Sequence, residues 1–183
     1  EQLREHWPVL RARWRFIALL GILGFTAFNT LMYLAAYSTS AINLGILQGS
    51  IPVFVLIGAL LAYRTPIGAM QALGVAVTLV GVAVTASRGD IHVLMGLRFA
   101  AGDLLMILAC VLYAGYTVAI RNRPAVPGLV FFTAVACVAC LFSLPLLAGE
   151  IALGQFHAPT VKGWAILAYT VIGPSLLSQL FFM

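Results

Sequence analysis

Long apolar runs separated by short polar stretches dominate the chain from residue 16 onward. Each run has about 20 residues, which is the length that a helix needs to cross the hydrocarbon core of a bilayer. The sequence predicts six such helices, over residues 16–37, 41–63, 67–87, 100–120, 127–148 and 163–183. These runs take up most of the chain, so the predicted fold class is an all-α membrane protein, a polytopic helix bundle.

The composition agrees with a membrane protein, and the charges give an orientation. The chain of 183 residues is 63% hydrophobic and only 8% charged, whereas soluble domains have roughly 25% charged residues. Seven of the ten Lys and Arg residues lie before the first predicted helix, between the second and third, or between the fourth and fifth. Basic residues concentrate on cytoplasmic loops. Residues 1–15 are therefore expected in the cytoplasm, and the membrane is expected to be the bacterial inner (plasma) membrane.

The first and last predicted helices share a pattern of small and polar residues at an offset of 149 residues. At this offset Gly173 aligns with Gly24, and Ser178 aligns with Asn29. The last helix is the fifth after the first, so the two must run in opposite directions, as in the inverted repeats of transporters. The same offset predicts two further helices before the first and two after the last. The chain is therefore expected to be a fragment of a ten-helix protein with an inverted five-plus-five repeat.

Three stretches of the chain carry a family resemblance: NTLMYLAAYSTSAINLGILQGSIPVFVLIGALLAY, MQALGVAVTLVGVAVTAS and GDLLMILACVLYAGYTVAIRNR. They resemble the EamA-type permeases of the drug/metabolite transporter superfamily, and the resemblance extends over nearly all of the chain from Arg15. It implies ten helices in two inverted repeats and export of small metabolites, often amino acids. Residues 1–98 would then be the C-terminal part of the first repeat, and residues 99–183 the N-terminal part of the second. One departure is Ala62-Tyr63-Arg64, where the family often has Gly-Glu-Arg/Lys, so a role for that acid does not carry over.

Two predicted helices contain a proline next to polar residues. Pro52 lies near the middle of the second helix and removes the backbone hydrogen bond to the carbonyl of Gln48. Pro174 lies in the sixth helix and is followed by Ser178 and Gln179. Irregular backbone at membrane depth is stable only where protein or a water-filled cavity covers it. Two such breaks therefore predict a binding site, and a plain kink repaired by Ser or Thr hydroxyls is the alternative.

A polar and aromatic stripe follows one face of the first predicted helix. Its members are Thr26, Asn29, Thr30, Tyr33 and Tyr37. Because an amide facing lipid leaves donors unpaired, this face is expected to turn inward, either as a cavity wall or as a source of helix–helix hydrogen bonds. Tyr113 and Thr117 share a face of the fourth helix. The predicted substrate-binding site is one cavity without fixed charge, near the bilayer midplane between the first, second, fourth and sixth helices. Its predicted residues are Asn29, Tyr33, Gln48, Tyr113, Ser178 and Gln179.

Several other residues have structural interpretations. Small residues on one face of the third helix (Gly74, Thr78, Gly81 and Thr85) predict close packing against another helix. Asp103 is expected to be an N-cap. The three cysteines, Cys110, Cys137 and Cys140, are expected to be small buried side chains, because the C-x-x-C pair has no second pair or histidine near it.

No Asp, Glu, His, Lys or Arg lies deep in any predicted helix. Intramembrane ionisable residues mark most proton relays and metal sites. We therefore expect no enzyme activity, no cofactor and no metal.

The predicted function is export of small neutral or zwitterionic metabolites, such as amino acids, by alternating access through a polar and aromatic cavity. One alternative is a helix bundle that does not transport, a structural or partner-binding subunit. Another is a carrier of sugar nucleotides or phosphorylated metabolites from the same superfamily. The expected partners are a small-molecule substrate and the lipid bilayer, with a homodimer as a further option. No nucleic acid is expected.

Overall fold

The structure is a computed structural model, and it describes residues 2–173. Within this range the chain forms only helices and loops. The helices are α1 (Gln2–Glu5), α2 (Trp7–Ala12), α3 (Trp14–Gly21), η1 (Ile22–Ala27), α4 (Phe28–Ala36), α5 (Ala41–Gly49), α6 (Ile51–Tyr63), α7 (Ala69–Ala86), α8 (Ile91–Met95), α9 (Ala101–Ala119), η2 (Ile120–Asn122), α10 (Gly128–Ala152) and α11 (Val161–Thr170).

Five helical stretches are long and apolar enough to cross a membrane. They are Trp14–Ala36, Ala41–Tyr63, Ala69–Ala86, Ala101–Asn122 and Gly128–Ala152. These stretches confirm five of the six predicted helices, with boundaries that differ by only a few residues. The sixth is described as a shorter apolar helix, Val161–Gly173, and the remainder of the predicted helix lies outside the described residues. The fold class is therefore a polytopic helix bundle, as predicted.

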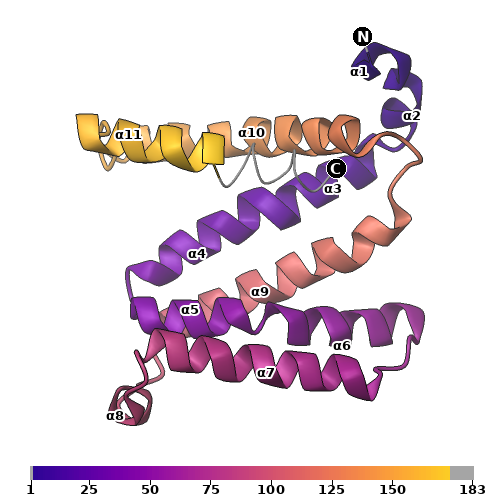
Figure 1. Cartoon of the computed structure of the whole chain (residues 1–183). Helices are drawn as coiled ribbons and strands as arrows, with labels where there is room; N and C mark the ends of the chain where they lie inside the picture. The colour runs from indigo at the N-terminus through magenta and orange to yellow at the C-terminus, as the bar shows by residue number, and fades with distance from the viewer. Residues whose placement is uncertain (1, 174–183) are drawn as a thin grey trace.

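Helix α9 occupies the centre of the bundle. It packs against α4, η1, α5 and α6, while α10 packs against α3 and η1, and α7 packs against α5. Figure 1 shows the first span crossing between α10 on one side and the α5–α6 and α7 pair on the other. The first span thus has one face toward α10 and another toward α9.

Two apolar clusters hold these helices together. The first joins α2, α3 and α10 through Leu10, Ile17, Leu20, Val126, Val130, Phe131 and Val135. The second joins α4 to α9 through Phe28, Ala35, Met106, Ala109 and Cys110. The first cluster closes the end of the bundle where α3 and α10 begin. Toward the opposite end α4 turns away from α10 (Figure 1).

The middle of the first span is π-helical over six residues, Ile22–Ala27. Gly24 lies in this segment, and a Cβ atom built there would be 2.5 and 2.8 Å from the Cδ atoms of Tyr116. The absence of a side chain at Gly24 therefore lets the Tyr116 ring of α9 lie directly on the backbone. Residues 171–173 are also π-helical. At the repeat offset of 149 residues, position 171 corresponds to Ile22, the first residue of the π-helical segment. This agrees with the predicted repeat, which stays a prediction.

The second span breaks at Ser50, two residues before Pro52, as the sequence predicted. Pro52 was expected to free the carbonyl of Gln48, but the side-chain hydrogen bonds at the break go to the carbonyl of the preceding residue, Leu47. This oxygen accepts hydrogen bonds from the Ser50 hydroxyl (2.6 Å) and from the Cys110 thiol of α9 (3.3 Å). The structure therefore agrees with the alternative of a kink repaired by a serine side chain.

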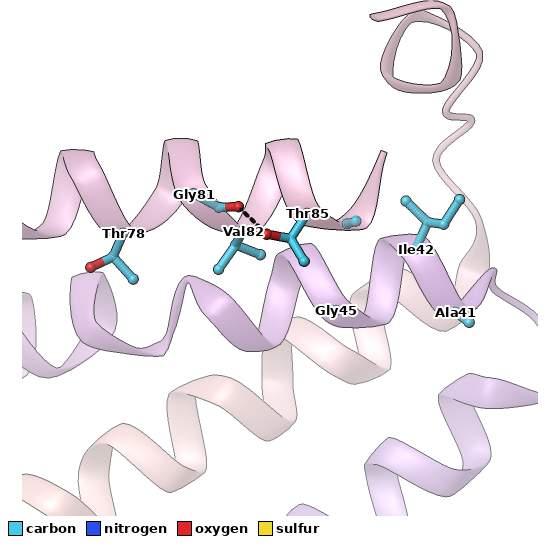
Figure 2. A pocket seen from close by; sticks show the side chains of 8 residues that line it. Ala41, Ile42, Gly45, Thr78, Gly81, Val82 and Thr85 are labelled. Carbon is cyan, nitrogen blue, oxygen red and sulfur yellow. Dashed lines mark hydrogen bonds between the residues drawn. The ribbon is translucent and has the colours of Figure 1, made fainter. Parts of the chain in front are cut away.

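The small-residue face of α7 does not pack as the sequence predicted. Among residues 2–173, no atom of another structural element would lie within 4 Å of a Cβ atom at Gly74 or at Gly81. The close approach between α5 and α7 is instead made where Val82 lies over Gly49. Figure 2 shows the face that is left: Thr78, Gly81 and Thr85 line a groove beside Gly45 and Ile42.

Asp103 lies three residues inside α9, so the prediction of an N-cap is wrong; the N-cap is Ala100. The carboxylate of Asp103 still serves the helix start, because it accepts a hydrogen bond from the Ala100 backbone N–H at 2.8 Å. It also accepts hydrogen bonds from the Thr39 hydroxyl and, at 3.1 and 3.2 Å, from the Asn43 amide. Asp103 is only 2% exposed. A buried carboxylate thus connects the turn between α4 and α5 to the start of α9.

The sequence departs from the family pattern at Ala62-Tyr63-Arg64. This segment connects two helices at the end of the bundle opposite to Asp103. The Tyr63 hydroxyl donates to the backbone oxygen of Val118 (3.2 Å) and accepts from the Asn122 side chain (2.9 Å). The guanidinium of Arg121 lies over the Tyr63 ring, 4.8 Å from its centre. Tyr63 therefore ties the end of α6 to the end of α9.

The cysteines were predicted to be buried, and only Cys110 is. Cys137 and Cys140 are exposed in the described structure. They lie on α10, whose residues from Cys140 to Ala152 are all exposed. Much of α10 therefore faces lipid, a groove, or elements outside the described range.

Candidate substrate groove

A groove with a volume of about 750 Å³ lies between the first span and α10. We call it the α4–α10 groove. Its lining residues are Phe25, Thr26, Asn29, Thr30, Tyr33, Leu34, Tyr37, Ala139, Cys140, Ser143, Pro145, Leu146, Leu147, Gly149, Glu150, Leu153 and Gln155. All five members of the polar and aromatic stripe predicted from the sequence are in this list. The volume is in the range of small-molecule sites, about 300–1,000 Å³.

The floor of the groove is a hydrogen-bonded contact between η1 and α10. The Thr26 hydroxyl donates to the backbone oxygen of Ala139 at 3.1 Å. The Ser143 hydroxyl donates to the same oxygen at 2.8 Å. Thr26 is almost fully buried, so it is a helix–helix contact, which is the alternative role considered for this stripe. Between this contact and the start of α3, the first apolar cluster holds α3 and α10 together.

The α4 wall carries polar groups whose donors are used locally. The Asn29 side-chain nitrogen donates to the backbone oxygen of Phe25 at 2.8 Å. The Thr30 hydroxyl donates to that of Thr26 at 2.7 Å. Both bonds run within the span, so the Asn29 side-chain oxygen and the lone pairs of the Thr30 hydroxyl remain as acceptors on a half-buried surface. Neither side chain makes a helix–helix bond within residues 2–173.

Two tyrosines occupy the upper part of the α4 wall. Tyr33 is 65% exposed and Tyr37 is 90% exposed. Leu146 and Leu147 of α10, which line the same groove, are 49% and 41% exposed. These are large apolar and aromatic surfaces without a partner in the part of the chain that the structure describes, and they favour contact with an apolar molecule.

The α10 wall also carries a charge that the sequence did not predict. Ala139, Ser143, Leu146 and Glu150 are spaced by four, three and four residues, so they lie on one face of α10. The carboxylate of Glu150 makes no ion pair or hydrogen bond with any described side chain. None of the described Lys, Arg or His residues lines the groove. This groove therefore differs from the predicted cavity, which lay between other helices and had no fixed charge, because Glu150 makes it acidic.

The other predicted site residues lie elsewhere. Tyr113 and Thr117 line a second groove of about 510 Å³ between α6, α7 and α9, together with Pro52. Gln48 is exposed and lines none of the pockets considered. Ser178, Gln179 and Pro174 lie outside the described residues. The structure thus brings together Asn29 and Tyr33 but places Tyr113 in a different groove, and the single cavity stays a prediction.

A row of aromatic rings separates the two grooves. Phe28 packs against Tyr113, Tyr113 against Tyr116, and Tyr116 against Phe25, with ring centres 4.8, 5.5 and 5.5 Å apart. Phe25 lines the α4–α10 groove and Tyr113 lines the second groove. The ring contacts therefore link a residue of one groove to a residue of the other through Tyr116.

The third groove, drawn in Figure 2, offers little to a polar ligand. It lies between α5 and α7 and is lined by small and apolar side chains apart from Thr78 and Thr85. The hydroxyls of these two residues donate to the backbone oxygens of Gly74 and Gly81, at 2.9 and 2.8 Å. Its chemistry suits a hydrocarbon chain or an apolar helix face.

Fold and groove together define a multi-pass integral membrane protein with a polar and aromatic groove against its first span. Residues 2–87 match the sequence model of the EamA-like transporter family. This part of the chain is therefore similar to EamA-like transporters, in agreement with the resemblance seen in the sequence.

One curated relative is similar to the chain over a longer stretch. It is 29% identical over 100 residues to "Uncharacterized transporter YyaM" of Bacillus subtilis (strain 168). The match covers 55% of this chain and 33% of that protein, so the chain corresponds to about a third of its length. No solved structure matches the chain significantly.

Proposed function

We propose that the protein is a transporter that exports small neutral or zwitterionic metabolites, such as amino acids, and that the α4–α10 groove is its substrate site. The observation that carries the proposal is the convergence of the Asn29–Tyr37 stripe with the exposed face of α10 on one groove. The family match of residues 2–87 and the transporter relative support membrane transport in general. Residues 1–15 would lie on the cytoplasmic side of a bacterial inner membrane.

The proposed transport mechanism is alternating access around the floor of the groove. In the described conformation the first apolar cluster, which contains Leu20 and Phe131, joins α3 to α10 at one end of the bundle. Tyr63 joins α6 to α9 at the same end. The groove opens at the opposite end, which the proposed orientation places outside the cell. The reverse conformation would bring α4 toward α10 at the open end and separate the cluster. The π-helical segment and the break at Ser50 are the positions where the helices are least regular.

The alternative of a phosphate-bearing substrate is disfavoured by the charges. A sugar-nucleotide or phosphorylated-metabolite site needs Lys or Arg against the phosphate oxygens. The α4–α10 groove has no such residue and contains Glu150. An anionic substrate would therefore be repelled in the groove.

The first experiment tests whether the groove is wet, which separates a transporter from a bundle whose polar residues serve only packing. Cys140 lines the groove, and Cys137, one helical turn away, does not. A hydrophilic, membrane-impermeant methanethiosulfonate reagent should modify Cys140 in reconstituted protein, while Cys137 should react much more slowly. Peptide mass spectrometry measures both in the same sample, with Cys137→Ser and Cys140→Ser variants as assignment controls. Equal and low reactivity of the two thiols would contradict the proposal.

The second experiment tests the substrate contacts. Tyr33→Ala should reduce counterflow of leucine in proteoliposomes by about tenfold, because a ring contact is worth on the order of 1 kcal/mol or more. Asn29→Ala should reduce it by a similar factor. Phe142→Ala is the matched control, since Phe142 is an exposed aromatic residue of α10 outside the groove lining. If all three variants transport alike, the site is not in this groove.

A further inference from the structure

We propose that Glu150 is the ammonium-binding residue of the groove, so that the substrates are molecules carrying a protonated amine next to an apolar body. This inference rests on the proposed function, and it goes further because it names the charge that a substrate must carry and how it lies in the groove. The residue is a specificity determinant rather than part of the fold.

The first step is the position of Glu150 along the groove. The Thr26–Ala139 hydrogen bond fixes the point where the two walls meet. Tyr37 lies 11 residues beyond Thr26, and Glu150 lies 11 residues beyond Ala139. At 1.5 Å per residue both are about 16 Å from the floor. Tyr37 and Glu150 therefore lie at similar distances from the floor along their own helices, toward the open end of the groove.

The second step is the electrostatic state of the carboxylate. Glu150 has no described basic side chain with which to form an ion pair, and none lines the groove with it. An unpaired carboxylate beside apolar surface gains most from a ligand that brings its own positive charge. The exposed face of the Tyr37 ring, at a similar distance from the floor, is also favourable for a cation.

The third step is the surface just below the charge. Leu146, Leu147 and Tyr33 lie about one helical turn deeper than Glu150 and Tyr37 and are largely exposed. A primary amine held at Glu150 would place its aliphatic or aromatic portion on these side chains. The acceptors deeper in the groove, on Asn29 and Thr30, are neutral and would receive a hydroxyl or amide donor. The arrangement thus fits amines and amino acids and excludes carboxylic acids that lack an amine.

The test uses three probes that share one carbon skeleton. These are leucine, isoamylamine, which lacks the carboxylate, and isocaproate, which lacks the ammonium. Binding to the purified protein is measured by thermal stabilisation, and transport by inhibition of leucine counterflow. The native protein should bind leucine and isoamylamine, and isocaproate should bind at least about tenfold more weakly.

Glu150→Gln should weaken the two amines by about tenfold and leave isocaproate unchanged or improved. Glu150→Lys should reverse the preference in favour of isocaproate, which a purely structural role would not produce. Glu5→Gln is the matched control, because it removes the same charge from an exposed residue far from the groove. Size-exclusion profiles show that each variant is folded.

Two results would overturn the inference. In one, Glu150→Gln leaves amine binding unchanged while Tyr33→Ala still impairs it, so the groove remains the site and Glu150 has no part in recognition. In the other, Glu150→Gln weakens all three probes equally, so Glu150 acts on the groove and not on the ammonium. Loss of binding in Tyr33→Ala or reactivity at Cys140 reports on the proposed function separately.

Discussion

The contact between Gly24 and Tyr116 makes a strong prediction about stability. Replacing Gly24 with alanine adds one methyl group, which would lie 2.5 and 2.8 Å from two ring carbons of Tyr116 and closer still to Cγ. Carbon atoms prefer separations of about 3.5–4.0 Å. The ring must therefore move by about 1 Å, and it cannot move freely, because Phe25 and Tyr113 pack against it with ring centres at 5.5 Å.

The magnitude follows from comparison with a second glycine. Overpacking of this kind typically costs about 1–3 kcal/mol. Glycine to alanine in a helix also gains up to about 1 kcal/mol in helix propensity. Gly45→Ala shares that gain without the clash, since a Cβ atom at Gly45 would have no other atom within 4 Å. The difference between the two variants should thus be about 1–3 kcal/mol, with Gly24→Ala the less stable.

The measurement is the free energy of unfolding in mixed SDS micelles, followed by tryptophan fluorescence. A second pair of variants carries Tyr116→Leu, which removes the ring that the new methyl group would strike. In that background the cost of Gly24→Ala should fall by more than 1 kcal/mol, because the two residues are in contact. Equal stability of the Gly24 and Gly45 variants, or an undiminished cost after Tyr116→Leu, would refute the packing that we describe.

Two further predictions concern buried polar contacts. Asp103→Ala should lower the free energy of unfolding by about 3 kcal/mol, because three donors lose their acceptor. Asp90→Ala, at an exposed N-cap, is the control and should lower it by about 1 kcal/mol. Similar losses in the two variants would contradict the buried network around Asp103. Ser50→Ala alone should cost about 1 kcal/mol or less, since the Cys110 thiol still donates to the Leu47 carbonyl. Combined with Cys110→Ala, it should cost about the sum of the two single changes, because the backbone N–H of residue 50 still donates to the Leu47 carbonyl at 3.1 Å. SDS titration of the four proteins would contradict this account if the double change cost far more than that sum.

The spans could be predicted from the sequence because apolar length is a local property. A run such as Ala41–Tyr63 needs no knowledge of its neighbours to be recognised as membrane-spanning. The break before Pro52 was equally local, since proline removes a backbone donor wherever it occurs. The repair of that break was only partly local: Ser50 is adjacent in sequence, but Cys110 reaches Leu47 through the packing of α9 on α5.

The candidate site was less predictable, because it depends on which face each helix turns to its neighbours. The stripe from Thr26 to Tyr37 was recognised, since its spacing alone shows that polar residues share a face. Tyr113 was assigned to the same cavity, and the packing of α9 places it in another groove. Nothing in the sequence ordered the helices around the bundle.

Glu150 was missed for a simpler reason. The predicted fifth helix ended at residue 148, whereas α10 continues to Ala152. Glu150 was therefore assigned to a loop, although its spacing from Ala139 and Ser143 places it on the face that lines the groove. Pro145 could have drawn attention to the same helix, because it is a third proline inside a predicted span.

The π-helical segment sets the phase between the two halves of the first span. A π turn holds one residue more than an α turn, and one residue corresponds to a rotation of about 100° around the helix axis. Without the extra residue, α4 would be rotated by that angle relative to α3. Ile17 and Leu20 would still pack against α10, but Asn29, Tyr33 and Tyr37 would turn away from it. The π-helical segment thus gives one continuous span an anchoring half and a groove-facing half, and deletion of one residue within Ile22–Ala27 should remove the groove without unfolding α3.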